Sequence, residues 1–139
     1  MSKVMFTSHA TAKGGREGHV KSDDGLIDLN LVQPGSGSSE KGSNPEQLFA
    51  AGYSACYDGA LNLIASREDK DIDSTVTADV SLMEDPEDNG FQIGVRLNVE
   101  IKGVSQAEAE DLAKKAHDFC PYSKATRGNI NVEVIATAV

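Results

Sequence analysis

One helical segment constrains the fold of this chain more than any other. Residues 44–47 read NPEQ, which places Asn at a helix N-cap, Pro at the first helical position and Gln three residues after the cap. This combination is typical of a helix start, because Asn and Gln satisfy free backbone N–H groups and Pro lacks one. Residues 48–65, which follow, are apolar on most faces. A helix over residues 45–66 must therefore be buried inside the protein or at a subunit interface.

The residues before this helix favour short strands. Residues 3–13 tolerate β structure and end at a Gly-Gly bend, and residues 19–22 and 26–31 flank an Asp-Asp-Gly turn. This spacing predicts a small antiparallel meander. The Gly/Ser-rich segment 34–43 predicts a mobile loop between the meander and the helix.

The residues after the helix predict further strands. Residues 74–84 and 91–102 alternate apolar and polar side chains around a turn rich in Asp, Pro, Asn and Gly. This pattern predicts a hairpin with one solvated face. Residues 130–138 predict a last strand. The chain is therefore expected to have an α+β fold, and its 139 residues fit a single domain over residues 1–139.

Composition argues against several classes of function. The chain has 22 acidic and 13 basic side chains, a net charge of -9 and no basic cluster, so nucleic-acid binding is not expected. The N-terminal residues lack an apolar signal sequence, and no segment reads as a membrane span, which predicts a soluble cytoplasmic protein. The three histidines are not spaced as metal ligands, so no metal is expected. Two cysteines in a reducing compartment are more often reactive than structural.

Cys56 lies about three turns into the first helix. The helix N-terminus cannot lower its pKa much, because that influence fades within the first turn. A nucleophilic role therefore needs a cation from elsewhere, and the alternative is that Cys56 is a small buried apolar side chain. Gly52, Gly59 and Leu63 share its face of the helix, and the glycines are expected to let another backbone approach the sulfur. Asp58 points to another side and is not expected to act as a base.

Cys120 lies at the end of a second predicted helix. Ser105 and Glu108 form a capping box that opens this helix, which is expected to run to about Phe119. Pro121 ends or kinks it directly after the thiol. A second thiol that can move is what a sulfenic acid needs for its resolution. The sequence thus favours a reactive pair of thiols, in which Cys120 is the one that moves.

Three basic residues are candidates for stabilising a thiolate. Arg16 follows the Gly-Gly bend, and Lys124 and Arg127 follow the second cysteine. Arg16 is preferred because a guanidinium stays charged when desolvated and can hold a thiolate and a carboxylate together, although an Arg in a turn is equally compatible with a surface role. Glu46 is a candidate partner for Arg16, but an acid in the first turn of a helix usually just complements the helix dipole.

Three motifs together carry a family resemblance. They are NPEQLFAAGYSAC at residues 44–56, GGR at 14–16, and CPYS at 120–123 followed by RGN at 127–129. In these motifs, and over essentially its whole length, the chain resembles the organic hydroperoxide resistance (Ohr) branch of the Ohr/OsmC family. The resemblance implies an α+β, OsmC/Ohr-like fold in which antiparallel sheets wrap around two central helices of an intertwined homodimer, with active sites at the subunit interface.

The resemblance also implies a reaction and its residues. Cys56 matches the family's peroxidatic cysteine, Cys120 its resolving cysteine, and Arg16 and Glu46 its activating pair. The implied activity is thiol-dependent reduction of alkyl and fatty-acid hydroperoxides to alcohols, through an intramolecular disulfide, in defence against oxidative stress. The implied reductant is a lipoyl-type dithiol co-substrate, either dihydrolipoamide or a lipoylated protein, with no bound cofactor.

An apolar wall is expected beside the peroxidatic thiol. Its candidate residues are Leu48, Phe49, Leu63 and Phe119. Such a wall favours alkyl hydroperoxides over hydrogen peroxide, because each buried methylene gains about 0.8 kcal/mol. Two other functions stay open, namely an OsmC-type peroxidase with a broader peroxide preference and a non-catalytic redox-sensing or binding dimer. A sensor that binds DNA is disfavoured, because the acidic chain shows no basic recognition helix.

Overall fold

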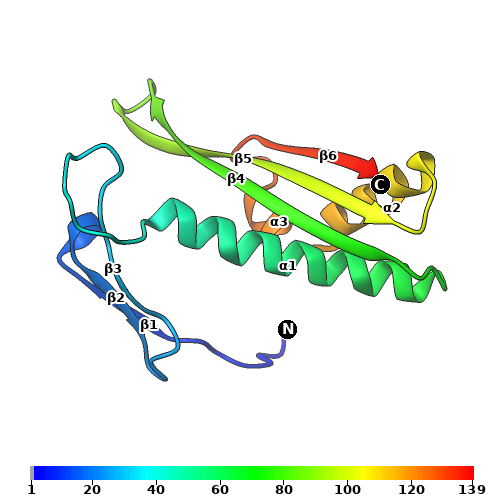
Figure 1. Ribbon diagram of the computed structural model, residues 1–139, viewed down its shortest axis with the longest axis horizontal. Helices are drawn as coiled ribbons and strands as arrows, with labels where there is room; N and C mark the ends of the chain where they lie inside the picture. The colour runs from blue at the N-terminus through cyan, green and yellow to red at the C-terminus, as the bar shows by residue number, and fades with distance from the viewer. Residues whose placement is uncertain (1) are drawn as a thin grey trace. The chain divides into compact units, whose positions relative to one another are not determined.

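The computed structural model describes residues 2–139 and divides into two compact units. The N-terminal unit extends to Leu48, and the C-terminal unit comprises Phe49–Val139. One helix, α1 (Pro45–Arg67), begins in the first unit and continues through the second (Figure 1). The predicted helix over residues 45–66 is therefore confirmed to within one residue. The assignment of the whole chain to a single domain stays a prediction.

The N-terminal unit contains the predicted meander. Its sheet is antiparallel and consists, in order, of β1 (Ala10–Lys13), β2 (His19–Ser22) and β3 (Asp28–Asn30), with a 3-10 turn, η1 (Gly15–Glu17), between the first two. The first strand is shorter than the pattern over residues 3–13 predicted, since only its last part pairs with β2. Gly14 and Gly15 have φ angles of 83° and 65°. These left-handed values favour glycine and explain the bend.

The start of α1 is capped as predicted. The backbone N–H of Gln47 donates to Oδ1 of Asn44 at 2.8 Å, which is the N-cap hydrogen bond. The hydroxyl of Ser43 donates to Oε1 of Gln47 at 2.7 Å, and Ser43 also bridges to Leu31. These contacts fix the end of the loop at residues 34–43, whose mobility stays a prediction.

In the C-terminal unit, α1 buries one of its faces. The side chains on this face are Tyr53, Tyr57, Ala60, Leu61 and Ala65. Leu63, by contrast, is 40 % exposed. The helix is apolar on more than one face, so a single chain leaves apolar helix surface uncovered.

The C-terminal sheet has three strands, in the order β4-β5-β6. They are β4 (Asp73–Asp85), β5 (Gly90–Lys102) and β6 (Val132–Ala138). The first two form the predicted antiparallel hairpin. The last strand pairs with β5 in parallel, so the sheet is mixed, whereas the family resemblance implied antiparallel sheets. Parallel pairing needs a long crossover, and two helices provide it between β5 and β6 (Figure 1).

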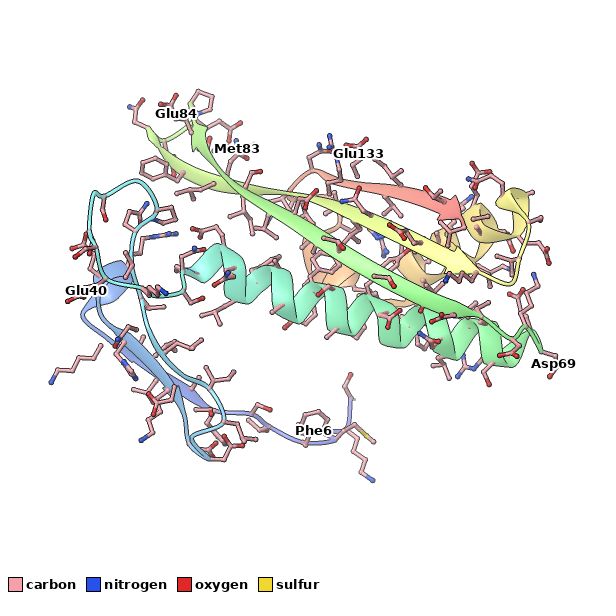
Figure 2. The ribbon with its side chains drawn as sticks, viewed as in Figure 1. Phe6, Glu40, Asp69, Met83, Glu84 and Glu133 are labelled. Carbon is pink, nitrogen blue, oxygen red and sulfur yellow. The ribbon has the colours of Figure 1, made fainter. Side chains whose placement is uncertain are left out.

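The two faces of this sheet differ in polarity. In the second half of β5 every second residue is buried, and these residues pack with α1 in one core; they are Val95, Leu97, Val99 and Ile101. The other face is polar and carries an ion pair in which Nε of Arg96 lies 3.2 Å from Oε2 of Glu133. Figure 2 shows Glu133 on the side of the sheet away from α1. The prediction of one solvated face is confirmed.

Two helices form the crossover. The first, α2 (Gln106–Phe119), opens with the predicted capping box at Ser105. The second, α3 (Pro121–Thr126), was not predicted. Pro121 ends α2 as expected, but proline is also favoured at the first position of a helix. Cys120 is therefore both the C-cap of α2 and the N-cap of α3.

Candidate active site

The two cysteines lie together in the C-terminal unit. Both Cys56 and Cys120 are free thiols, and Cys120 is close enough to act as a hydrogen-bond partner and charge neighbour of Cys56. Cys120 is fully buried, and Cys56 is partly buried against the same core. The fold achieves this by packing α2 against α1, where the hydroxyl of Tyr57 donates to the carbonyl oxygen of Ala113 at 2.6 Å.

The surroundings of Cys56 act on its pKa in opposite directions. Burial is the largest effect and raises the pKa of the Cys56 thiol, and Cys120 raises it further. The backbone N–H of Tyr122 donates toward the sulfur and partly offsets this rise. Because the net pKa is raised, the C-terminal unit by itself favours the protonated thiol at neutral pH. A thiolate needs a further cation, as expected from the sequence.

Tyr122 is a contact of the site that the sequence reading missed. Its N–H lies in the first turn of α3, where amides have no partner inside the helix. Its ring lies against α1, because a Cβ built on Gly52 would be 2.6 Å from the Tyr122 hydroxyl oxygen. Gly52 thus leaves room for the aromatic side chain of Tyr122. The sequence had instead predicted that this glycine would let another backbone segment approach. Pro121 is the sequence signal that could have revealed this contact, because proline is favoured at the first position of a helix, where backbone N–H groups are free to bind another group.

Arg16 and Glu46 form a two-pronged ion pair in the N-terminal unit. Nη1 and Nη2 of Arg16 donate to Oε1 and Oε2 of Glu46 at 2.7 and 2.9 Å. The hydrogen bond from Arg16 is the main cause that lowers the pKa of the Glu46 carboxyl. The Arg16 side chain is 42 % exposed, and a guanidinium has five N–H groups, so donors remain for another acceptor. Glu46 therefore does more than complement the helix dipole, since its carboxylate also binds Arg16.

The other two candidate cations are engaged elsewhere. Nζ of Lys124 lies 5.6 Å from the centre of the Phe119 ring, and the guanidinium carbon of Arg67 lies 5.4 Å from the same ring. Nη2 of Arg127 donates to the backbone oxygen of His117 at 2.7 Å. These contacts of Lys124 and Arg127 therefore involve groups other than the two thiols.

A hollow of about 500 Å³ opens beside Tyr122. Its apolar lining consists of Phe49, Ile93, Pro121, Tyr122, Ala125 and Ile130. Of the four residues predicted to form an apolar wall, Phe49 lines this hollow. Leu48 belongs to the N-terminal unit, Leu63 is 40 % exposed, and Phe119 is 39 % exposed next to two cations. The hollow is thus built mainly from residues that the sequence did not single out.

Asp58, two residues after Cys56, has a structural partner. Asp58 accepts a hydrogen bond of 2.6 Å from the hydroxyl of Ser74 and so ties α1 to β4. Among residues 2–139, no three His, Cys, Asp or Glu side chains lie close enough together to hold a metal ion. None of the helices described in this range has the length and apolar character needed to cross a membrane.

Known proteins of similar sequence and structure identify the family. The family model described as OsmC-like protein matches residues 36–135. Organic hydroperoxide resistance protein OhrB of Bacillus subtilis (strain 168) is 50% identical over 132 residues, which cover 94% of this chain and 97% of that protein. OhrA of the same strain is 52% identical over 135 residues, with coverages of 95% and 96%. The crystal structure of OhrB superposes with a TM-score of 0.92 and covers 94% of this chain and 98% of that one.

The fold and the thiol pair therefore define an α+β protein of the OsmC-like class. More narrowly, the chain belongs to the organic hydroperoxide resistance branch of the OsmC-like family. The family and the fold class expected from the sequence motifs are confirmed.

Proposed function

We propose that the protein is a thiol peroxidase that reduces organic hydroperoxides in defence against oxidative stress. The observation that carries the proposal is that two free thiols share one core, in which Cys56 packs against the buried cluster that contains Cys120. One thiol is partly exposed and the other is buried, which suits a nucleophile that meets the substrate and a partner that resolves it. The relatives named as organic hydroperoxide resistance proteins support the choice of oxidant.

The proposed reaction begins with attack of the Cys56 thiolate on the terminal oxygen of a hydroperoxide, ROOH. The O–O bond breaks, an S–O bond forms, and the alkoxide takes up a proton and leaves as the alcohol, ROH. Sulfur gives up two electrons and becomes a sulfenic acid. The Cys120 thiol then attacks this sulfur, an S–S bond forms, and the hydroxyl leaves with the thiol proton as water.

The catalytic cycle closes with a dithiol reductant. A thiolate of the reductant attacks the protein disulfide, and its second thiol completes the exchange, so that the protein regains two thiols and the reductant becomes a cyclic disulfide. A lipoyl-type dithiol, as dihydrolipoamide or on a lipoylated protein, is the proposed co-substrate. The proposed location is the cytoplasm, where thiols are kept reduced.

Arg16 is the proposed source of the positive charge that Cys56 needs. Burial raises the pKa of the Cys56 thiol, and a nearby guanidinium favours the thiolate. Glu46 holds the guanidinium by two hydrogen bonds, which fixes the plane of the group and leaves other donors for the sulfur. The pair therefore acts as an oriented cation that is in place before the peroxide arrives.

The proposed site for the alkyl chain of the substrate is the hollow beside Tyr122. Phe49, Ile93 and Ala125 give it an apolar lining. Each methylene buried there gains about 0.8 kcal/mol, a gain that hydrogen peroxide cannot obtain. An OsmC-type enzyme of broader preference is the second candidate, and the ratio of kcat/KM for an organic hydroperoxide to that for hydrogen peroxide separates the two.

A homodimer is the proposed assembly. The support from this chain is α1, whose apolar side chains extend beyond its buried face, with Leu63 40 % exposed. A second copy of the chain would cover such a surface. Light scattering coupled to size-exclusion chromatography tests this, and a mass equal to that of one chain across micromolar concentrations would contradict it.

Steady-state turnover tests the peroxidase proposal. The wild type should reduce tert-butyl hydroperoxide continuously with dihydrolipoamide, and Cys56→Ser should fall to the background rate. Ser66→Ala changes an exposed residue near the end of the same helix and is the control. Full turnover by Cys56→Ser would disprove the assigned nucleophile, and a single disulfide per chain without turnover would favour a redox sensor.

A further inference from the structure

A group of polar side chains is buried next to the segment that carries Cys120. At its centre is Ser123, which is fully buried. The Ser123 Oγ lies 2.8 Å from the hydroxyl oxygen of Tyr53 and 2.7 Å from Nδ1 of His117. Tyr53 belongs to α1, His117 to α2 and Ser123 to α3. One hydroxyl group therefore joins three helices.

Thr126 extends this group. Its Oγ1 donates to the backbone oxygen of Tyr122 at 3.0 Å and lies 3.4 Å from the hydroxyl oxygen of Tyr53. Within residues 2–139, every buried side-chain nitrogen or oxygen has a hydrogen-bond partner. Since a buried polar group that loses its partner is costly, these side chains are restricted to the positions that satisfy one another.

We propose that Ser123, through its bonds to Tyr53 and His117, is a positioning residue for the thiol pair. It fixes the first turn of α3 against α1 and α2. That turn starts at Cys120 and contains the N–H of Tyr122, which donates toward the sulfur of Cys56. The inference rests on the proposed function in one respect, because it takes the two cysteines as the reacting pair.

The length and composition of α3 explain why such a residue is needed. The helix has six residues, too few to be stable without tertiary contacts. Its buried side chains are Ser123 and Thr126, and both carry hydroxyl groups that lie within hydrogen-bonding distance of Tyr53. Hydrogen bonds are directional, so they fix the rotation of α3 about its own axis more closely than an apolar contact would.

The backbone around Cys120 is consistent with a fixed geometry. Its N–H donates to the carbonyl oxygen of Ala116 at 2.8 Å, and its carbonyl oxygen accepts from the N–H of Lys124 at 3.0 Å. The sequence predicted that Cys120 is the thiol that moves, whereas its backbone is bonded on both sides in the reduced protein. Orientation of this kind shortens the search for the reactive geometry, so loosening α3 should slow the meeting of the two sulfurs.

Two readouts on the full chain test the role of Ser123 without peroxidase turnover. The first is the pH dependence of Cys56 alkylation by iodoacetamide, measured with Cys120→Ser present. The second is the rate of disulfide formation with diamide when both cysteines are present. Ser123→Ala should move the alkylation profile to higher pH and slow disulfide formation about threefold or more, because each of the two hydrogen bonds that its hydroxyl makes contributes about 0.5–1.5 kcal/mol.

Ser74→Ala is the matched control. The Ser74 hydroxyl donates to Asp58 at 2.6 Å and joins α1 to β4. A Ser→Ala change at this position therefore also removes a hydrogen bond to α1, but one that does not involve α3. It should leave both readouts at the wild-type values. Unchanged readouts for Ser123→Ala would overturn the inference, because Ser123 would then have no effect on the thiols. Equal changes for Ser74→Ala would also overturn it, because the effect would then follow from the loss of any hydrogen bond to α1.

Tyr53→Phe supplies a second, independent test. It removes the same hydrogen bond from the α1 side and keeps the ring, so it should act in the same direction, and it carries the test if Ser123→Ala does not fold. The double variant should cost less than the sum of the two single variants, because both remove the bond between Ser123 and Tyr53, and full additivity would contradict a shared role. If these outcomes hold while the wild type reduces no hydroperoxide, the proposed function fails and the positioning role stands.

Discussion

The hydroxyl group of Tyr122 occupies the space over Gly52, where a Cβ would lie 2.6 Å from the hydroxyl oxygen and 3.1 Å from Cζ. No side chain larger than hydrogen fits there unless the ring moves. The same tyrosine directs its backbone N–H toward Cys56. The packing of the Tyr122 ring and the surroundings of the thiol are therefore coupled through one residue.

Replacing Gly52 should disturb the thiol. Gly52→Ala pushes the Tyr122 ring away and should lower the rate of Cys56 alkylation at neutral pH about threefold or more, because the N–H contact is weakened. Gly59→Ala is the control, since its added methyl meets nothing within 4 Å and alanine stabilises a helix by about 0.5–1 kcal/mol relative to glycine. Equal losses at both positions would mean that α1 itself, rather than the Tyr122 contact, is sensitive.

Replacing Arg16 by lysine should lower activity although the charge is kept. Lysine cannot form the two parallel hydrogen bonds to Glu46, and charge-assisted bonds of this kind contribute about 1.5–3 kcal/mol. We expect kcat/KM for tert-butyl hydroperoxide to fall about ten- to hundredfold at pH 7. Arg96→Lys makes the same change in an exposed ion pair with Glu133 and should have no effect. Unchanged kinetics for Arg16→Lys would show that the planar fork is not needed.

Mixed dimers should reveal which subunit supplies Arg16. Arg16 and its partner Glu46 belong to the N-terminal unit, and Cys56 belongs to the C-terminal unit. The family resemblance implies active sites at the subunit interface, so we expect Arg16 to serve the thiol of the partner subunit. Mixing Arg16→Ala and Cys56→Ser chains in equal amounts should restore about a quarter of wild-type activity, because about half the dimers are mixed and each has one intact site. If the mixture stays inactive after the subunits have exchanged, Arg16 serves its own chain.

Stability should depend on pH through His117. Burial, followed by Arg127, lowers the pKa of His117, and Asp118 acts in the opposite direction. Because the folded pKa lies below the unfolded value of about 6.5, the unfolded chain takes up the proton first. His117 therefore does not change the free energy of unfolding above its unfolded pKa. The free energy of unfolding decreases as the pH falls from that value toward the folded pKa.

Urea unfolding between pH 5 and pH 8 measures this dependence. His117→Asn keeps an acceptor near the position of Nδ1 but does not titrate, so its free energy of unfolding should fall less than that of the wild type below about pH 6.5. A wild-type protein that gained stability relative to this variant on acidification would contradict the assigned direction.

Filling the hollow should change the choice of peroxide. Ala125→Phe adds a ring at the lining of the hollow and should lower kcat/KM for a long-chain hydroperoxide at least tenfold, since a chain that loses two buried methylenes loses about 1.6 kcal/mol. Activity with hydrogen peroxide, which needs no apolar site, should be unchanged. An equal loss for both peroxides would show that the alkyl chain binds elsewhere.

The parts of the fold that were predictable from sequence are those with local signals. Asn44 and Pro45 mark the start of α1 by hydrogen-bonding and backbone preferences that act within one turn, and Ser105 does the same for α2. The β4 and β5 hairpin follows from alternation around a short turn. Each of these elements could be located without knowing what packs against it.

The contacts missed by the sequence reading join distant segments. The parallel pairing of β6, the Tyr122 ring over Gly52 and the network of Ser123 with Tyr53 all depend on the crossover through α2 and α3. The α3 helix was missed because proline both ends and begins helices. The pairing of Arg16 with Glu46 is also distant in sequence; local sequence offered it as a candidate, and the family motifs implied it.

The central position of β5 has a consequence for repeated oxidation and reduction. Its backbone groups are bonded to β4 on one side and to β6 on the other, so its amide protons should exchange with solvent more slowly than those at the edges of the sheet. Both cysteines lie outside the sheet, in α1 and at the junction of α2 and α3. Formation and reduction of the proposed disulfide would therefore take place in the helical layer, while the most slowly opening part of the protein keeps its hydrogen bonds.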